Sequence, residues 1–541
     1  MQLKTVPAAL AAAALLAVAP DLAATDLPRG PATAEALGSV EFPVSCTPEA
    51  QRHFTRAMQL YHNFYFPETR KAFDAVLQAD PACAMGHWGH AMVVMDNPFQ
   101  WPLRGKALGD GWARIEKARA LGPKTERESL YVAAVEVFFR NPESGVDRTR
   151  QLAYEVAMDA LVRRYPADTE AQILHALAIS ANFDPNDKDY TNQKKAAAIL
   201  EPIFAKQPDH PGVAHYIVHS YDYPAIASLG VPAAHRYAEI AASAPHAQHM
   251  PSHIFTRVGA WHDSIASNRE AARIAAAADP RQWLHALDYL VYAYLQLGQE
   301  REAKAIVDQV LALKRVPEEN FVAAHAVAAI PARYAIERGR WQDATRLALS
   351  PAEPDFSWQQ FPHAEAVLVY ARGLGAARSG DIAGARRDAE RLGKLKEAML
   401  EGKLGYWAGQ ADIQIGVVNA WIARAGGRNE EALRLLRAAA DREDSTEKNT
   451  VTPGPLKPAR ELLGELLVEV GRPAQALPEF EATMRKEPNR LRSLYGAARA
   501  AELAGDAGKA REYYAKLVAL GESADPAQTE IETAKRFVAR R

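Results

Sequence analysis

Histidine is concentrated in one part of this 541-residue chain. Eight of its sixteen histidines lie between residues 210 and 262. Five of the eight have the spacing of metal ligands: His215, His219, His246, His249 and His253. The first two are four residues apart, and residues four apart in a helix lie on the same face. The segment PGVAHYIVHSYDYP therefore predicts that two imidazoles from one helix can reach one ion.

Imidazole binds zinc, copper, iron and nickel, and three or more imidazoles can hold an ion without a thiolate. The sequence thus predicts one divalent or transition-metal ion: zinc, copper or iron. Its predicted ligands are His215, His219, His249 and His253, with His246 as the next candidate. Three protein ligands and an open position would suit hydrolytic or oxidative chemistry on a small molecule. The alternatives are a structural hydrogen-bond network or a catalytic base.

The elements that must position these groups are helices. Pro251 suits the first turn of a helix, which places His253 inside that helix. His246 and His249 are then expected on the connecting loop before it. Asp222 and Tyr221, just after the first histidine pair, are weak candidates for catalytic residues, either orienting a ligand or transferring a proton.

Two further histidines have two readings each. His62 is either a structural residue of the first repeat or a remote ligand. His285 lies in WLHALDYLVYAYL. It is either part of an aromatic packing stripe or, because its helix should lie close to the hairpin of His253, a residue that lines the same cavity. Common catalytic signatures are missing, because the sequence contains no HExxH, P-loop, G-x-G-x-x-G or G-x-S-x-G motif.

A Gly-x4-Ala phrase recurs along the chain. Its glycines are Gly298, Gly339, Gly380, Gly427, Gly471 and Gly505, at offsets of 41, 41, 47, 44 and 34 residues. Gly259 with Ser264 extends the series backwards by 39 residues. We expect each glycine to end a first helix, and the small residue five positions later to let a second helix pack closely.

Repeats of this length with two helices each predict an all-α solenoid of stacked hairpins, similar to tetratricopeptide (TPR) repeats. No strands are expected. The predicted regions are a helical-repeat region with the histidine cluster at 46–280, central repeats at 281–440, a polar loop at 441–458 and C-terminal repeats at 459–541.

The first 24 residues have the features of a signal peptide: a short basic start, an apolar run of about a dozen residues and small residues at its end. A flexible segment is expected over 25–45. No later stretch is long and apolar enough to span a membrane. The chain is therefore expected to be periplasmic or secreted. In an oxidising compartment its two cysteines, Cys46 and Cys83, could pair, and the sequence leaves this open.

The charge balance is near neutral, with 64 basic and 66 acidic residues and a net charge of −2. A nucleic-acid-binding protein would show a basic surplus with interleaved aromatic residues. No nucleic-acid partner is expected.

Several phrases together resemble a family of exported bacterial TPR proteins: SCTPEAQRHF, LYHNFYFPETRKAF, DPACAMGHWGHAM, HYIVHSYDYP, PHAQHMPSHIFTRVGAW and EKNTVTPGPLKPARELLGELL. The resemblance covers nearly the whole mature chain. It implies a helical-repeat fold and a shared histidine-rich site, and it implies no particular activity. His87 and His90 depart from the usual phrase of this family and are therefore weaker candidates for ligands.

Two functions remain. One is a solenoid with an internal metal centre, which would be a metalloenzyme acting on a small molecule. The other is a non-catalytic scaffold that binds a peptide or partner protein in its groove. The first helices are dominated by alanine, leucine and aromatic residues, which favours a closed interior and therefore the metal centre.

Overall fold

The computed structural model describes residues 35–100, 106–144, 148–277, 279–316, 318–352, 354–526 and 528–540. The leader predicted over 1–24 lies outside the described residues. Residues 36–541 form one compact unit. Its described residues form helices and no strands, which confirms the all-α prediction.

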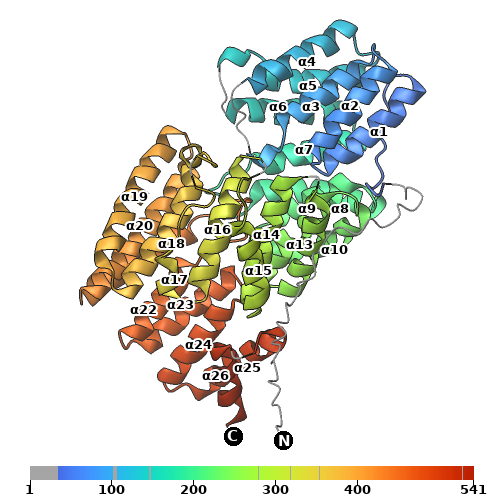
Figure 1. Ribbon diagram of the computed structural model, residues 1–541. Coiled ribbons are helices and arrows are strands. Elements are labelled where there is room, and N and C mark those ends of the chain that lie inside the picture. Colours follow the sequence, from blue (N-terminus) through green and yellow to red (C-terminus); the bar gives the residue numbers. More distant parts are fainter. Residues whose placement is uncertain are drawn as a thin grey trace, which may run out of the picture. The chain divides into compact units, whose positions relative to one another are not determined.

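The helices follow one another as antiparallel pairs, as the colour order in Figure 1 shows. The first pairs are α1 (Pro48–His62), α2 (Phe66–Ala79), α3 (Ala84–Met95), α4 (Ala107–Leu121), α5 (Glu126–Phe139), α6 (Arg148–Arg164), α7 (Thr169–Ala181) and α8 (Thr191–Lys206). The central helices are α9 (Pro211–Tyr221), α10 (Val231–Ile240), α11 (Pro245–His249), α12 (Pro251–Val258), α13 (Trp261–Ala275), α14 (Pro280–Gln296), α15 (Glu300–Leu311), α16 (Phe321–Glu337) and α17 (Trp341–Ala344). The last are α18 (Pro362–Ser379), α19 (Ile382–Glu401), α20 (Gly405–Ala425), α21 (Asn429–Asp444), α22 (Ala459–Glu469), α23 (Pro473–Lys486), α24 (Leu491–Leu503), α25 (Ala507–Leu520) and α26 (Thr529–Ala539). Short 3₁₀ turns interrupt the series at Pro98–Gln100, Pro142–Ser144, Ala227–Gly230, Trp358–Gln360 and Gly521–Ser523.

The recurring glycine sets the hairpin geometry. All seven glycines of the series have positive φ, between 65° and 90°, a backbone conformation that residues with a Cβ rarely adopt. The small residue five positions later is fully buried in every repeat, as Ala303 and Ser264 illustrate. The repeat phrase therefore specifies both the turn and the close approach of each helix pair, and the TPR-like fold is confirmed.

One repeat departs from the pattern. After Gly339 the second helix, α17, has four residues and ends at Ala344. Pro351 and Pro354 follow, and proline lacks the N–H that a helix interior needs. The remainder of this unit is a loop that leads to α18.

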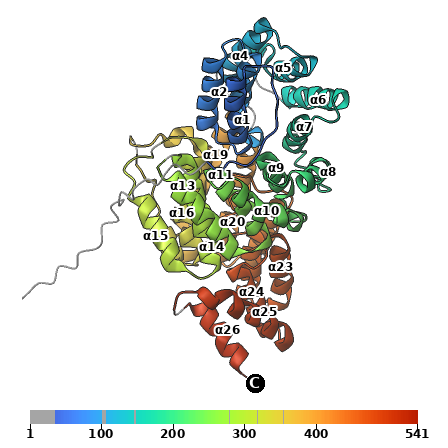
Figure 2. The same cartoon turned by 90° about the vertical axis from the view of Figure 1, so that its right-hand side faces the viewer.

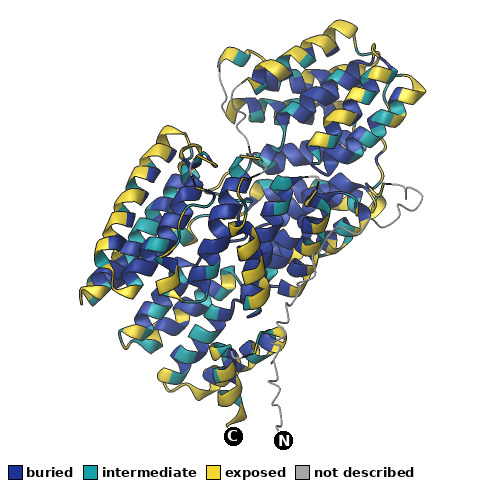
Figure 3. Ribbon diagram, viewed as in Figure 1, coloured by how far each residue is buried: buried dark blue, intermediate teal, exposed yellow. Residues whose placement is uncertain are grey.

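Burial follows the two-layer arrangement of the repeats. In Figure 3 the helices α14 and α16 are largely dark blue, whereas α15 and α19 carry exposed yellow faces. The turned view in Figure 2 shows α13, α14 and α16 side by side, in agreement with their contacts. The apolar core consists of two clusters, one from residues 37–255 and one from 261–534. The histidine-rich helices lie in sequence at the border between the two.

The segment before α1 is attached to the fold. Of the flexible segment predicted over 25–45, residues 25–34 lie outside the described residues. In the rest, Ser39 donates its backbone N–H to the carbonyl of Asp209, and the side chain of Phe42 is buried. Residues 36–45 therefore form neither helix nor strand and pack on the helices.

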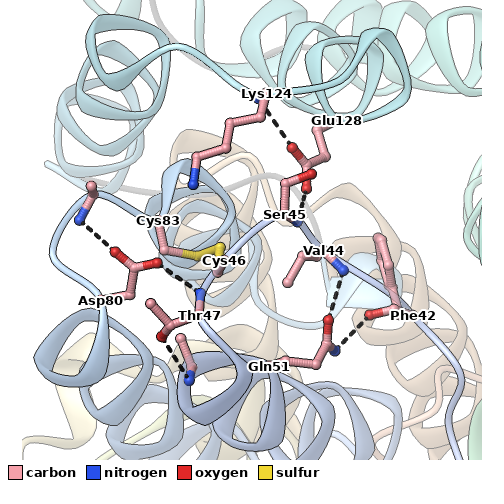
Figure 4. Close-up of a disulfide and its surroundings, with 12 residues drawn as sticks. Phe42, Val44, Ser45, Cys46, Thr47, Gln51, Asp80, Cys83, Lys124 and Glu128 are labelled. Atoms are coloured by element: carbon pink, nitrogen blue, oxygen red, sulfur yellow. Dashed lines mark hydrogen bonds between the residues drawn. A yellow bond between two sulfur atoms is a disulfide. The ribbon is translucent and has the colours of Figure 1, made fainter.

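Cys46 and Cys83 form a disulfide, which the sequence had left open (Figure 4). The Cα atoms are 5.3 Å apart, because Cys46 precedes α1 and Cys83 precedes α3 in adjacent repeats. The backbone N–H of Thr47 also donates to Asp80 at 2.9 Å, so the same two segments are joined a second time.

Replacing both cysteines by serine is expected to destabilise the first repeats by about 3 to 4 kcal/mol, because the bridge closes a loop of 37 residues. Hydrogen exchange of the α1–α3 amides measures this loss, and the amides of α22–α25 serve as the internal reference. Unchanged exchange in α1–α3 would contradict the prediction.

Among the described residues, no helix combines the length and apolar character required to cross a bilayer.

Candidate metal centre

Helix α9 carries the first histidine pair. Pro211 occupies its first turn, and Nδ1 of His210 accepts the N–H of Val213 as a cap. All eleven residues of the helix are buried. As predicted, His215 and His219 lie one turn apart, with ring centroids 4.8 Å from each other.

The second group of histidines lies on two short helices. The expectation that His246 and His249 lie on a loop is wrong: both belong to α11, and His253 belongs to α12. Met250, between the helices, keeps helical backbone angles, so α12 follows α11 without an intervening loop. Pro251 separates them because it cannot supply a helical N–H.

The structure divides the predicted ligands into two triads. In the first triad, the ligand atoms of His215, His219 and His246 all lie within 4.8 Å of one another. Nε2 of His215 and Nε2 of His246 are 3.2 Å apart. Phe64 contacts the ring of His215 edge-on, and Phe99 stacks on His219 with a centroid distance of 4.1 Å.

The second triad consists of His249, His253 and His285, with ligand atoms again within 4.8 Å. Nε2 of His249 and Nε2 of His253 are 3.0 Å apart. His285 comes from α14, so its place is in the cluster as well as in the aromatic stripe of that helix. The four ligands predicted for one ion are therefore shared between two groups, two in each.

Both triads border one cavity. Its wall contains histidines of the first triad, His219 and His246, and of the second, His253 and His285. The rings of His219 and His253 have centroids 6.4 Å apart. Nε2 of His219 and Nδ1 of His285 are buried and have no hydrogen-bond partner among the described residues. The cavity thus receives nitrogen atoms from both sides.

Three of the histidines are held by acceptors at Nδ1. His215 donates to the backbone carbonyl of His62 at 2.7 Å, His249 to Oδ1 of Asn268 at 2.6 Å, and His253 to Oδ2 of Asp222 at 2.8 Å. The amide of Asn268 is itself oriented, because its Nδ2 donates to the carbonyl of Ser264. Each of these rings therefore carries its proton on Nδ1 and directs the lone pair of Nε2 inward.

Asp222 is a buried junction of charges. Besides His253, it contacts Nε of Arg257 at 2.9 Å and Nζ of Lys448 at 3.0 Å. Burial acts to raise the pKa of Asp222, but Lys448 and Arg257 hold it well below its usual value. Burial lowers the pKa of Lys448 to about 8. Asp222 thus accepts a hydrogen bond from a histidine of the second triad, whereas the hydroxyl of Tyr221 donates to Glu201.

Burial also keeps the cluster histidines neutral. It lowers the pKa of five of them well below 6.5, and neighbouring histidines lower it further: His215, His219, His246, His249 and His285. A neutral imidazole is the form that binds a metal ion. At neutral pH the nitrogen atoms of the cluster are therefore available to a metal ion without competition from bound protons.

A third buried group needs no ion. Glu170 accepts Nε2–H of His210 at 2.7 Å and Nε2–H of His62 at 3.0 Å, and the hydroxyl of Tyr216 lies 2.9 Å from Nδ1 of His62. Every donor faces an acceptor, so this group is a complete hydrogen-bond network. His62 therefore has a structural role, and its carbonyl also positions His215.

This network predicts an acid-dependent contribution to stability. Burial raises the pKa of Glu170, but His210 and His62 lower it more, to about 2. Because the folded-state pKa lies below the unfolded value of 4.5, the contribution is present above pH 4.5 and is lost as the pH falls toward 2. Glu170→Gln should cost about 3 kcal/mol at neutral pH and flatten the decline in this window. Denaturant unfolding at several pH values tests this, with the exposed Glu116→Gln as control; a decline as steep in Glu170→Gln as in the wild type would contradict it.

His87 and His90, which depart from the usual phrase of the family, are not part of the triads. His90 lies 3.1 Å from the carboxylate of Asp74, and neither it nor His87 belongs to the histidine groups described above.

Sequence reasoning missed Asn268, Gln282 and Lys448. Lys448 is 226 residues from its partner Asp222 and lies in the loop between α21 and α22. No local pattern marks these residues, because their role depends on which helices are neighbours.

No protein-family model and no curated protein matches the chain. Among solved structures, it is similar to human IFIT1 in a dimer with m7Gppp-AAAA, at 11% identity and a TM-score of 0.37, over 81% of this chain and 90% of that one. It is also similar to yeast Tom70, at 12% identity and a TM-score of 0.29, over 90% and 94% of the two chains. A third is the TPR domain of P58(IPK), at 12% identity and a TM-score of 0.20, over 91% and 99%. Similarity at this level carries no functional argument, and the helical-repeat fold rests on the repeated hairpins of this chain itself.

Proposed function

We propose that this helical-repeat protein binds two transition-metal ions, one in each histidine triad, and that the centre acts on a small molecule. The observation that carries the proposal is the contact between His249 and His253. Both rings donate from Nδ1 to fixed acceptors, Asn268 and Asp222, so neither has a proton on Nε2 when neutral. Yet the two Nε2 atoms are 3.0 Å apart.

Two lone pairs at that distance repel each other unless a cation lies between them. In a tetrahedral zinc site with Zn–N bonds of 2.0–2.1 Å, neighbouring nitrogens are about 3.3 Å apart. The distances of 3.0 Å in the second triad and 3.2 Å in the first are close to this value. The ligand atom of His285, the third residue of the second triad, lies within 4.8 Å of those of His249 and His253.

The first triad requires one adjustment to match. Nε2 of Gln282 contacts Nδ1 of His246 at 3.2 Å, while Oε1 of Gln282 is buried and has no hydrogen-bond partner in the described part of the chain. A 180° turn of this amide would pair Oε1 with Nδ1–H of His246. It would satisfy the unpaired oxygen and free Nε2 of His246 for a metal ion.

Imidazole-only ligand sets suit zinc, copper and iron. Three ligands in each triad leave positions for a small molecule at the cavity, and a metal ion there would supply Lewis-acid or redox chemistry. His215, His219 and His246 would hold one ion, and His249, His253 and His285 the other. Asp222, Asn268 and the carbonyl of His62 would orient the ligands.

We also propose that the protein acts in the periplasm or outside the cell. The leader-like residues 1–24 support this, and so does the disulfide, because disulfides persist in oxidising compartments.

The test is a metal count. Protein freed of metal with a chelator is incubated separately with Zn²⁺, Cu²⁺ and Fe²⁺, desalted and analysed by atomic emission. We expect about two equivalents of at least one of these metals per chain. No uptake of any of them would overturn the proposal and favour a scaffold that binds a peptide or protein.

A further inference from the structure

The cavity between the triads has no negatively charged side chain in its described lining. Besides the histidines, its described lining contains Asn97, Gln282, Thr450 and several apolar side chains. Among these residues there is no aspartate or glutamate, and the one charged side chain is Arg281. The cavity is therefore neutral to positive before any metal is bound.

Metal ions would increase this imbalance. All six proposed ligands are neutral, so they cancel none of the charge of two divalent ions. Asp222, the carboxylate that contacts His253 of the second triad, is already shared with Arg257 and Lys448. Buried charge that is not compensated is costly, so a ligand that carries negative charge would be strongly favoured in this cavity.

Arg281 is free to bind such a ligand. It is half-buried, lines the cavity and has no hydrogen bond or ion pair to any described residue. The guanidinium group presents paired N–H donors that match the oxygens of carboxylate and phosphate groups. We propose that the cavity binds a small anion through its carboxylate or phosphate oxygens, with Arg281 as the residue that selects for negative charge. This inference rests on the proposed metal function.

The experiment is calorimetric titration of metal-loaded protein with sodium acetate and, separately, with inorganic phosphate; acetamide serves as the uncharged probe. We expect wild-type protein to bind at least one of the two anions and not acetamide. Arg281→Gln should bind that anion about ten- to a hundred-fold more weakly, and Arg281→Lys should lose less because it keeps the charge. The exposed Arg346→Gln is the matched control and should bind like the wild type.

The metal content of every variant separates the two proposals. A wild-type protein without metal contradicts the proposed function, whatever the anion result. Two bound metals with equal anion affinity in the wild type and Arg281→Gln would overturn the anion proposal alone, as would tighter binding of acetamide than of either anion. The stronger of the acetate and phosphate responses identifies the anionic group.

Discussion

Replacing His249 and His253 together by alanine is expected to remove one of two bound metal ions and to leave the other. Only His285 of the second triad remains in this variant, whereas the first triad is intact. The complementary variant, His215→Ala with His219→Ala, should lose the first ion and keep the second. Atomic emission after metal loading gives the count, and circular dichroism should show nearly unchanged helix content because the repeats supply the fold.

The matched control is His175→Ala. His175 is a buried histidine of α7, and it belongs to none of the histidine groups described here. Its replacement leaves a similar cavity and should leave both ions bound. Loss of all metal from either double variant would indicate a single shared centre, and retention of all metal in both would place the ions elsewhere.

The second large effect is expected at Asp222. In Asp222→Asn, an amide with one neutral acceptor oxygen replaces the carboxylate that accepts Nδ1–H of His253, so this ring loses the negative charge that raises its basicity. The affinity of the second site should fall about ten- to a hundred-fold. Arg257 and Lys448 also lose their buried counter-charge, so we expect the protein to be destabilised by about 3 to 5 kcal/mol.

Competition with a chelator measures the two metal affinities, and denaturant unfolding measures the stability. Asp388→Asn is the control, since Asp388 is an equally buried carboxylate that pairs with Arg372 on distant helices. It should leave both metal affinities unchanged. An equal loss of affinity at both sites in Asp222→Asn would show that the variant acts through general destabilisation and that Asp222 does not orient the second site.

The repeat architecture was predictable because its determinants are local. The turn at Gly298 requires positive φ, and the close packing at Ala303 requires a small side chain, and both lie within six residues of sequence. The pairing of His215 with His219 on one face is local in the same way, since it follows from the pitch of an α-helix. These two features could be predicted without knowing which helices are neighbours in the tertiary structure.

The division of the site into two triads was decided by tertiary structure. His246 and His249 belong to the same short helix, yet one joins the triad of α9 and the other joins His285 of α14. The prediction of one ion failed to separate them because spacing along the chain does not tell which neighbouring helix each ring faces. The angle between stacked hairpins decides that.

The sequence by itself determined an all-α repeat, its hairpin turns and the region in which the histidines gather. It left open whether Cys46 and Cys83 are joined, how the imidazoles are grouped and which residues orient them. Lys448 reaches Asp222 only because the loop between α21 and α22 packs against the end of α9, and such a contact has no signature in either segment. Local geometry follows from a few adjacent residues, whereas these contacts follow from the summed packing of all the repeats between them.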